Sequence, residues 1–119
     1  MTAPATPTEV ALNLARLARD LDQTVKALQV ADRDATEKRA GYDLVFSRAF
    51  IAETGSIDHR RHLATIATHQ QRLEADVSEA LVRHLRRQVD AIKVRIDVGR
   101  TWASALKAEL TLGGQDGTP

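Results

Sequence analysis

The chain has 119 residues, enough for one domain and short for two, and 43% of them are hydrophobic, as is ordinary for a soluble globular or coiled-coil protein. It contains no cysteine, which excludes disulfide bonds, thiolate metal sites and thiol nucleophiles. No run of about 18 apolar residues is present, so no membrane span is expected. The net charge of +1 gives only weak attraction to nucleic acid or membranes unless the charge gathers on one face.

The apolar composition predicts long helices. Ala, Leu and Val dominate it, and the aromatic residues are only Tyr42, Phe46, Phe50 and Trp102. With 28% charged residues and little Gly or Pro between the ends, such a chain favours extended helices that pack through narrow apolar seams. The N-terminus MTAPATPTEV lacks the basic start and apolar stretch of a secretion signal, so a cytoplasmic protein is expected.

The first helix is predicted at about residues 8–53, after a disordered N-terminus at residues 1–7. Thr8 is expected to cap this helix, and Glu9 lies in its first turn. Gly41 could kink it. Apolar residues recur at spacings of three and four, as in a coiled coil. They are Val10, Leu14, Leu17, Leu21, Val25, Leu28, Ala31 and Ala35, and then Tyr42, Val45, Phe46, Ala49 and Phe50.

A turn is predicted at about residues 54–57, because Gly55 suits the left-handed backbone beyond a helix end and Ser56 or Asp58 can cap the next helix. The second helix is predicted at about residues 58–112. Gly113 and Gly114 would stop it before a disordered C-terminus at 113–119. Its predicted stripe is Leu63, Ile66, Leu73, Val77, Leu81, Leu85, Val89, Ile92, Ile96, Ala103, Leu106 and Leu110, with Gln70 and Gly99 as weak positions. The spacing of four from Val77 to Val89 predicts local unwinding of a supercoil.

These elements predict an all-α fold in which residues 8–112 form a single domain, a long antiparallel helical hairpin with coiled-coil-like seams. A hairpin alone would leave one side of each wide stripe exposed to water, so a homo-oligomer in the form of a helical bundle is also predicted. The candidate oligomer seam consists of Leu14, Leu17, Leu21, Leu28, Leu81, Leu85, Val89, Ile92, Ile96, Trp102 and Leu106. Trp102 is expected to pack over this seam or, alternatively, to anchor another protein.

The segment AETGSIDHRRH, residues 52–62, allows a structural, a metal or a phosphate interpretation. A hairpin turn accounts for its glycine and cap residues without any chemistry. His59 and His62 could share a metal, but zinc needs three or four ligands and His69 is about 10 Å further along the helix from His62. No metal and no cofactor are therefore expected.

Basic residues are concentrated in the second helix. Arg60 and Arg61 near its start could bind phosphate, and residues 82–100 add a second basic concentration. The candidate partner or phosphate contacts are Arg60, Arg61, Arg83, Arg86, Arg87, Lys93, Arg95 and Arg100. The alternative is a salt-bridged outer face, because opposite charges stand four residues apart, as at Glu79 and Arg83. No aromatic residues interleave with this patch, so recognition by base stacking is not expected.

Two stretches, SRAFIAETGSIDHRRHLATIAT and VRIDVGRTWASALKAEL, resemble small helical proteins from early gene regions of actinobacterial bacteriophages, near recombination and replication functions. The resemblance covers about residues 40–112 and brings no catalytic or ligand residues with it. It implies a phage or prophage protein that acts in the host cytoplasm through contacts with other proteins or with DNA.

No nucleophile elbow, glycine-rich phosphate loop or HExxH motif occurs, so no enzyme is expected. The predicted function is a non-enzymatic, oligomeric helical accessory protein of phage or prophage DNA metabolism, acting through protein contacts and, in one version, nucleic-acid backbone contacts. One alternative is an inhibitor or interaction protein that binds a host factor without nucleic acid. Another is a structural or assembly component of the virion.

Overall fold

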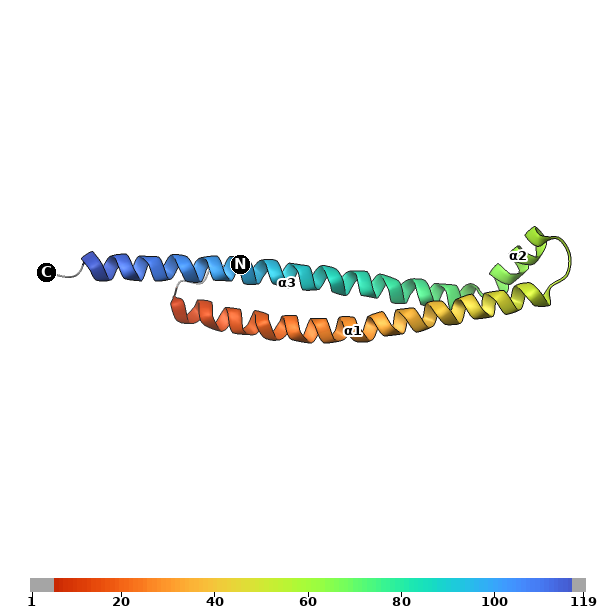
Figure 1. The fold of residues 1–119 in the computed structure, drawn as a ribbon, viewed down its shortest axis with the longest axis horizontal. Coiled ribbons are helices and arrows are strands. Elements are labelled where there is room, and N and C mark those ends of the chain that lie inside the picture. Colours follow the sequence, from red (N-terminus) through yellow and green to blue (C-terminus); the bar gives the residue numbers. More distant parts are fainter. Residues whose placement is uncertain (1–5, 117–119) are drawn as a thin grey trace. The chain divides into compact units, whose positions relative to one another are not determined.

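The computed structural model describes residues 6–116 of the chain, and the side chains of residues 6–113. This part contains three helices and no strand: α1 (Pro7–Ala52), α2 (Ile57–Ala67) and α3 (His69–Asp116). The chain divides into two compact units, unit 1 with Met1–Val25 and Arg87–Pro119, and unit 2 with Lys26–Arg86. In each unit a stretch of α1 lies beside an antiparallel stretch of α3 (Figure 1), so the prediction of an all-α helical hairpin is confirmed.

The start of α1 differs from the prediction. Thr6 Oγ1 accepts a hydrogen bond of 3.1 Å from the backbone N–H of Glu9, so the N-cap is Thr6 and not Thr8. Pro7 takes the first helical position, where a missing N–H costs nothing and the fixed φ suits a helix. Of the residues predicted to be disordered at this end, 1–5 lie outside the described residues. The helix then continues through Gly41 to Ala52 without a break.

The turn after α1 forms as predicted. Gly55 has a φ of 109°, a left-handed conformation that side chains with a Cβ rarely adopt. Ser56 caps α2, because its hydroxyl accepts a hydrogen bond of 3.2 Å from the backbone N–H of His59. Asp58 lies in the first turn of α2, where a carboxylate interacts favourably with the helix dipole. The cap is therefore the serine of the two predicted candidates.

The second predicted helix is in fact two helices, because the chain breaks at Thr68. The hydroxyl of Thr68 donates a hydrogen bond of 2.7 Å to the carbonyl oxygen of Ala64, whose other donor is the backbone N–H of Thr68 at 3.0 Å. Thr24 and Thr36 make the same bond inside α1 without breaking it, so this bond alone does not account for the end of α2. Both residues are buried, so the bend also removes them from solvent.

The C-terminal end of α3 was also predicted wrongly. The helix passes through Gly113 and Gly114 and ends at Asp116, four residues later than expected. Glycine at these positions costs roughly 1 kcal/mol of helix propensity each, which lowers helix stability without forbidding the helix. Residues 117–119 of the predicted disordered C-terminus lie outside the described residues.

The predicted apolar stripe of α1 is confirmed, because each of its members is buried or half-buried. The stripe of α3 is only partly right. Leu85, Val89, Ile92, Ile96, Ala103 and Leu106 are buried or half-buried as predicted, whereas Ile66 on α2 and Leu73, Val77, Leu81 and Leu110 on α3 are exposed. The buried stripe of α3 is Ala75, Ser78, Val82, Leu85, Val89, Ile92, Ile96, Gly99, Ala103 and Leu106. Its spacing alternates strictly between three and four, so the predicted unwinding between Val77 and Val89 is wrong.

Small side chains bring the helices of unit 2 together. Its buried cluster consists of Ala31 and Ala35 from α1 and Val82 from α3, with Leu28 and Leu85 packed against it. Alanine contributes little apolar area, so the hydrophobic stabilisation of this core is small for its length. Within the described residues, no helix is both long enough and apolar enough to cross a membrane.

Candidate interaction surfaces

The two sides of the buried stripe of α3 differ, because one carries mostly charged residues and the other carries more apolar ones. Each residue advances about 100° around a helix, so the residues just before and just after a buried position lie on opposite flanks. We call the residues that follow the buried positions the charged flank: Asp76, Glu79, Arg83, Arg86, Asp90, Lys93, Asp97, Arg100, Ser104 and Lys107. We call those that precede them the open flank: Glu74, Val77, Leu81, His84, Gln88, Ala91, Arg95, Val98, Trp102 and Ala105.

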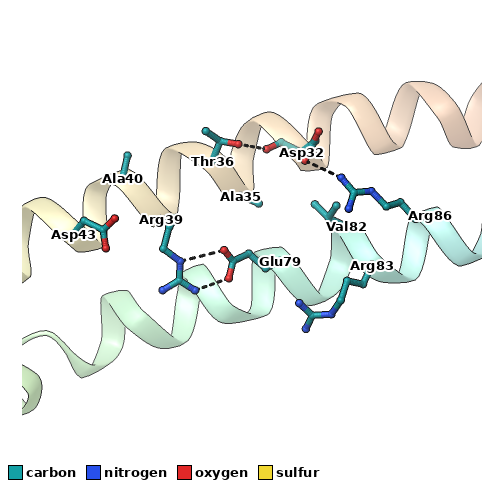
Figure 2. Close-up of a pocket in the computed structure, with 10 residues that line it drawn as sticks. All are labelled: Asp32, Ala35, Thr36, Arg39, Ala40, Asp43, Glu79, Val82, Arg83 and Arg86. Atoms are coloured by element: carbon teal, nitrogen blue, oxygen red, sulfur yellow. Dashed lines mark hydrogen bonds and ion pairs between the residues drawn. The ribbon is translucent and has the colours of Figure 1, made fainter.

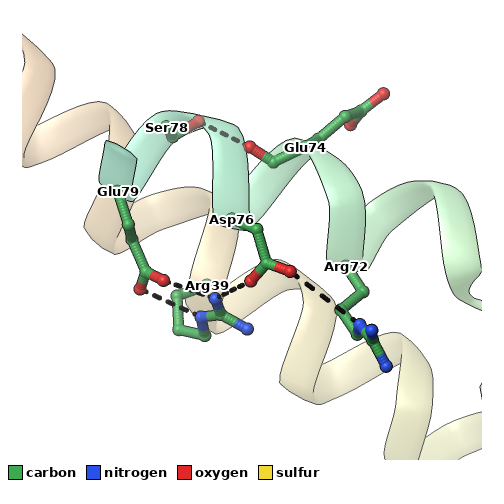
Figure 3. A network of polar contacts seen from close by, with 6 residues as sticks. All are labelled: Arg39, Arg72, Glu74, Asp76, Ser78 and Glu79. Atoms are coloured by element: carbon green, nitrogen blue, oxygen red, sulfur yellow. Dashed lines mark hydrogen bonds and ion pairs between the residues drawn. The ribbon is translucent and has the colours of Figure 1, made fainter. Parts of the chain in front are cut away.

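Arg39 of α1 binds the charged flank in unit 2. Its Nε donates a hydrogen bond of 3.1 Å to Glu79, and its terminal nitrogen lies 2.6 Å from Asp76 and also bonds Glu79 (Figure 3). The two bonds to Glu79 form the bidentate fork that a guanidinium makes with a carboxylate. These hydrogen bonds from Arg39 lower the pKa of Glu79 below its ordinary value, and the two carboxylates raise the pKa of Arg39.

A second link between α1 and the charged flank lies two turns of α3 beyond Glu79. Arg86 is 3.8 Å from Asp32 of α1, and both side chains are exposed (Figure 2). A groove beside these pairs is lined by Ala35, Val82 and Arg83 as well as by the paired residues (Figure 2). The Arg39–Glu79 and Arg86–Asp32 pairs are made within the chain, and Asp43 and Arg83 also line the groove.

Several apolar side chains of the open flank are exposed. Val77 is 61% exposed, Leu81 is 48% exposed and Trp102 is 40% exposed, although each stands next to a buried position. Val98 is also exposed. Trp102 is therefore partly covered and partly exposed, and its packing over the seam stays a prediction. All predicted residues of the oligomer seam except Leu81 and Trp102 are buried or half-buried within their own units.

The predicted basic contacts lie in different environments. Arg61 lies 3.5 Å from Asp58 of the same helix, and Arg83 and Arg86 line the groove of unit 2. In unit 1, Arg95 lines a groove with Asp20 and Arg100 lines one with Asp22. Arg87 and Lys93 are exposed. Four of the predicted contacts, Arg83, Arg86, Lys93 and Arg100, lie on the charged flank, where acidic side chains stand among them.

Arg60 has a structural contact that the sequence did not indicate. Its guanidinium lies 4.4 Å from the centre of the Phe50 ring, and its Nε donates a hydrogen bond of 3.3 Å to the Phe50 carbonyl oxygen. The bond supplies a donor to one of the last carbonyls of α1, which lack partners within the helix. Arg60 thus ties α2 to the end of α1, and Arg61 is the more available of the two arginines.

The histidines do not form a metal centre within the described part of the chain. His59, His62, His69 and His84 are all exposed. Residues 6–116 contain no group of three or more histidine, aspartate or glutamate side chains placed to hold one ion. Asp58 is paired with Arg61. The segment at residues 52–62 holds a turn and the cap of α2.

The candidate surfaces are thus a charged flank that α1 occupies in unit 2 and an open flank with exposed apolar side chains. The sequence signal that distinguishes the two flanks is the alternating spacing of three and four in the buried stripe. This spacing becomes visible only when small residues are counted as members of the stripe. Comparison with protein-family models, curated proteins and solved structures found no match to this chain.

Proposed function

We propose that the chain is a non-enzymatic helical accessory protein that self-associates and acts by contacting other proteins. The observation that carries the proposal is that apolar side chains of α3 are exposed beside buried positions, Val77 and Leu81 in unit 2 and Trp102 in unit 1. Exposed apolar side chains that gather on one side of a helix are typical of protein-binding surfaces, and tryptophan is enriched in interface hot spots. Its setting in phage or prophage DNA metabolism follows from the resemblance of residues 40–112.

The thin core of unit 2 supports self-association. Its cluster buries two alanines and one valine, so the apolar area removed from water is modest. Each square ångström of apolar surface buried on association adds about 25 cal/mol, and a partner that binds only the folded chain stabilises the fold. A second copy would therefore supply stabilisation that the core of one chain lacks.

Protein contact is better supported than nucleic-acid contact. The charged flank holds four acidic side chains and five basic ones, namely Asp76, Glu79, Asp90 and Asp97 against Arg83, Arg86, Lys93, Arg100 and Lys107. Binding to a DNA backbone favours a surface on which positive charge dominates. An alternating surface instead suits a protein partner with charges of both signs, which also favours the alternative of a host-factor-binding protein.

The mass of the full chain in solution tests self-association. We expect light scattering to give a mass above the 13.1 kDa of one chain, rising with concentration in the micromolar range. A single-chain mass at every concentration would overturn this part of the proposal.

A DNA titration at two salt concentrations tests the nucleic-acid version. If the phosphate backbone is bound, replacing Arg83, Arg86 and Arg87 by Glu should abolish salt-sensitive binding. The matched control replaces Arg16, Arg19 and Arg33 of α1, which are likewise exposed arginines, by Glu. Equal effects of the two triple variants, or no effect, would exclude specific DNA contact through α3 and leave the protein-binding version.

A further inference from the structure

The two ion pairs between α1 and α3 in unit 2 are related by a step of seven residues. Arg39 pairs with Glu79, and seven residues earlier in α1 Asp32 lies 3.8 Å from Arg86, which is seven residues later in α3. Seven residues make about two turns of helix, so each such step returns to the same side of both helices. The step therefore shows which residues of α1 and α3 are due to meet on this side.

In unit 1 the same steps of seven residues match cations of α3 with uncharged residues of α1. The positions are Val25 with Lys93, Ala18 with Arg100, and Ala11 with Lys107. The structure agrees for the last two, because Ala18 and Arg100 line one groove of unit 1, and Ala11 and Lys107 line another. At both positions α1 therefore lacks the counter-charge that it supplies in unit 2.

These two grooves adjoin at Leu14, and we call them together the unit 1 groove. Their volumes are about 630 and 310 Å³, within the range of clefts that bind ligands. Apart from Arg100, Lys107 and Asp22, all of their lining residues are apolar. The groove follows residues 96–110 of α3, or about 21 Å of helix. Its length and apolar lining suit the apolar face of a helix.

The two cations of the unit 1 groove are available to a partner. Arg100 and Lys107 are both exposed, and neither makes an ion pair within residues 6–113. Asp22, the acidic lining residue, has another interaction within the chain. The cations stand seven residues apart on α3, or about 10 Å along its axis. Two carboxylates with the same spacing would therefore meet both of them.

We propose that the unit 1 groove binds an amphipathic helix of another protein, whose carboxylates pair with Arg100 and Lys107. Acidic residues seven apart on that helix match the spacing of the two cations, and its apolar stripe fills the groove between them. Ala11, Ala15 and Ala18 are exposed and small, so they let the axis of a third helix come close to α1. This inference rests on the protein contact proposed above and names the class of partner.

A pair of synthetic peptides tests the chemistry of the partner. The glutamate peptide has about 18 residues and blocked ends, is rich in alanine so that it forms a helix, and carries a leucine stripe flanked by two glutamates seven residues apart. In the glutamine peptide both glutamates are replaced by glutamine. We expect the full chain to bind the glutamate peptide about fivefold to tenfold more tightly in isothermal titration at low salt. This difference should shrink at high salt.

Variants of the chain test the place of binding. In the double variant Ala11→Glu with Ala18→Glu, α1 supplies the missing counter-charges itself, so the glutamate peptide should bind about tenfold more weakly or worse. The control Ala27→Glu changes another exposed alanine of α1, about 180° around the helix from Ala18, and should leave binding unchanged. Arg100→Gln with Lys107→Gln should abolish the preference for the glutamate peptide. All variants should keep their helical circular dichroism.

The outcomes separate this inference from the proposed function. A glutamate peptide that does not bind, or binds no better than the glutamine peptide, overturns the acidic partner. Binding that survives Ala11→Glu with Ala18→Glu, or that Ala27→Glu weakens equally, overturns the groove and leaves protein contact through another surface standing. A fall in the mass of the full chain as the glutamate peptide is added would show that a second copy occupies the groove, which overturns the assignment to a different protein.

Discussion

Gly99 of α3 lies beneath the side chain of Leu14 of α1 in unit 1. A Cβ atom on Gly99 would come within 2.6 Å of Leu14 Cδ2 and 3.3 Å of its Cγ, both too close for a relaxed contact. The residue that weakens the apolar pattern of the sequence is thus the one that lets the leucine approach the α3 backbone. Glycine here serves close packing, at a cost of about 1 kcal/mol in helix propensity.

We expect Gly99→Ala to be less stable than its helix propensity implies. Gly41 provides the control, because a Cβ there meets nothing within 4 Å. Gly41→Ala should raise the free energy of unfolding by about 0.5–1 kcal/mol. The free energy of unfolding of Gly99→Ala should be about 1–3 kcal/mol lower than that of Gly41→Ala, because the added methyl group overpacks the contact with Leu14. Urea denaturation followed by circular dichroism measures both values.

A double variant identifies the origin of that difference. Combining Gly99→Ala with Leu14→Ala should remove the clash, so the cost of the glycine substitution should shrink in the Leu14→Ala background. Equal stabilisation by Gly41→Ala and Gly99→Ala in the wild-type background would show that Leu14 moves aside at no cost.

The fork between Arg39 and Glu79 predicts a loss of stability in acid. Arg39 holds the pKa of Glu79 below its ordinary value of 4.5 in the folded chain. The pair therefore stabilises the fold fully above pH 4.5, and this stabilisation is lost as the pH falls through the lower folded pKa. Thermal unfolding measured from neutral to acidic pH should show a smaller decline in Glu79→Gln than in the wild type.

Exposed Glu37 offers the matched control for that pH series, since it lies on α1 outside the Arg39 network. Glu37→Gln should keep the decline of the wild type. Parallel curves for the wild type and Glu79→Gln would mean that the fork contributes nothing to the stability of the folded chain in solution.

The contact of Arg60 with Phe50 predicts that α2 depends on a guanidinium. Arg60→Lys removes the flat cation over the ring and the Nε donor, a loss of about 0.5–1 kcal/mol. Amide hydrogen exchange within Ile57–Ala67 should become several-fold faster, while exchange in the middle of α1 stays unchanged. Arg61→Lys, at an exposed neighbouring site, should leave exchange in α2 as it is.

The turn at Gly55 predicts a further intolerance to a side chain. Its φ of 109° disfavours any residue with a Cβ, and that Cβ would lie 3.1 Å from His59 Cδ2. Gly55→Ala should lower the free energy of unfolding by about 1 kcal/mol or more. Removing the ring in His59→Ala should relieve only the contact, so most of the loss should persist in the double variant.

Helix content, the turn and the α1 seam could be predicted because their signals are local. Ser56, Gly55 and the spacing from Val10 to Phe50 carry them directly. The seam of α3 was misread between Leu73 and Leu81, because the large residues were taken as buried in place of Ala75 and Ser78. Where two helices approach closely, small side chains are buried and their large neighbours stay exposed. The size of a side chain therefore does not predict which residues of α3 face α1.

The break at Thr68 and the fork at Arg39 were missed for other reasons. Thr68 ends α2 with neither glycine nor proline nearby, and its hydroxyl bond to Ala64 has the same form as bonds inside the unbroken α1 and α3. The fork joins residues 40 apart in sequence, so its geometry depends on the pairing register of α1 and α3. Neither feature leaves a pattern that can be read from neighbouring residues.

The small residues buried in this chain determine which mutations it tolerates. In most cores the damaging change is loss of volume, because a cavity remains. Ala31, Ala35, Ala64 and Ala75 are buried with almost no volume to lose, so truncation at these sites removes little. Added methyl groups would instead push the helices apart along their length. Random mutagenesis should therefore find the harmful substitutions at these sites among larger residues, the opposite of the usual distribution.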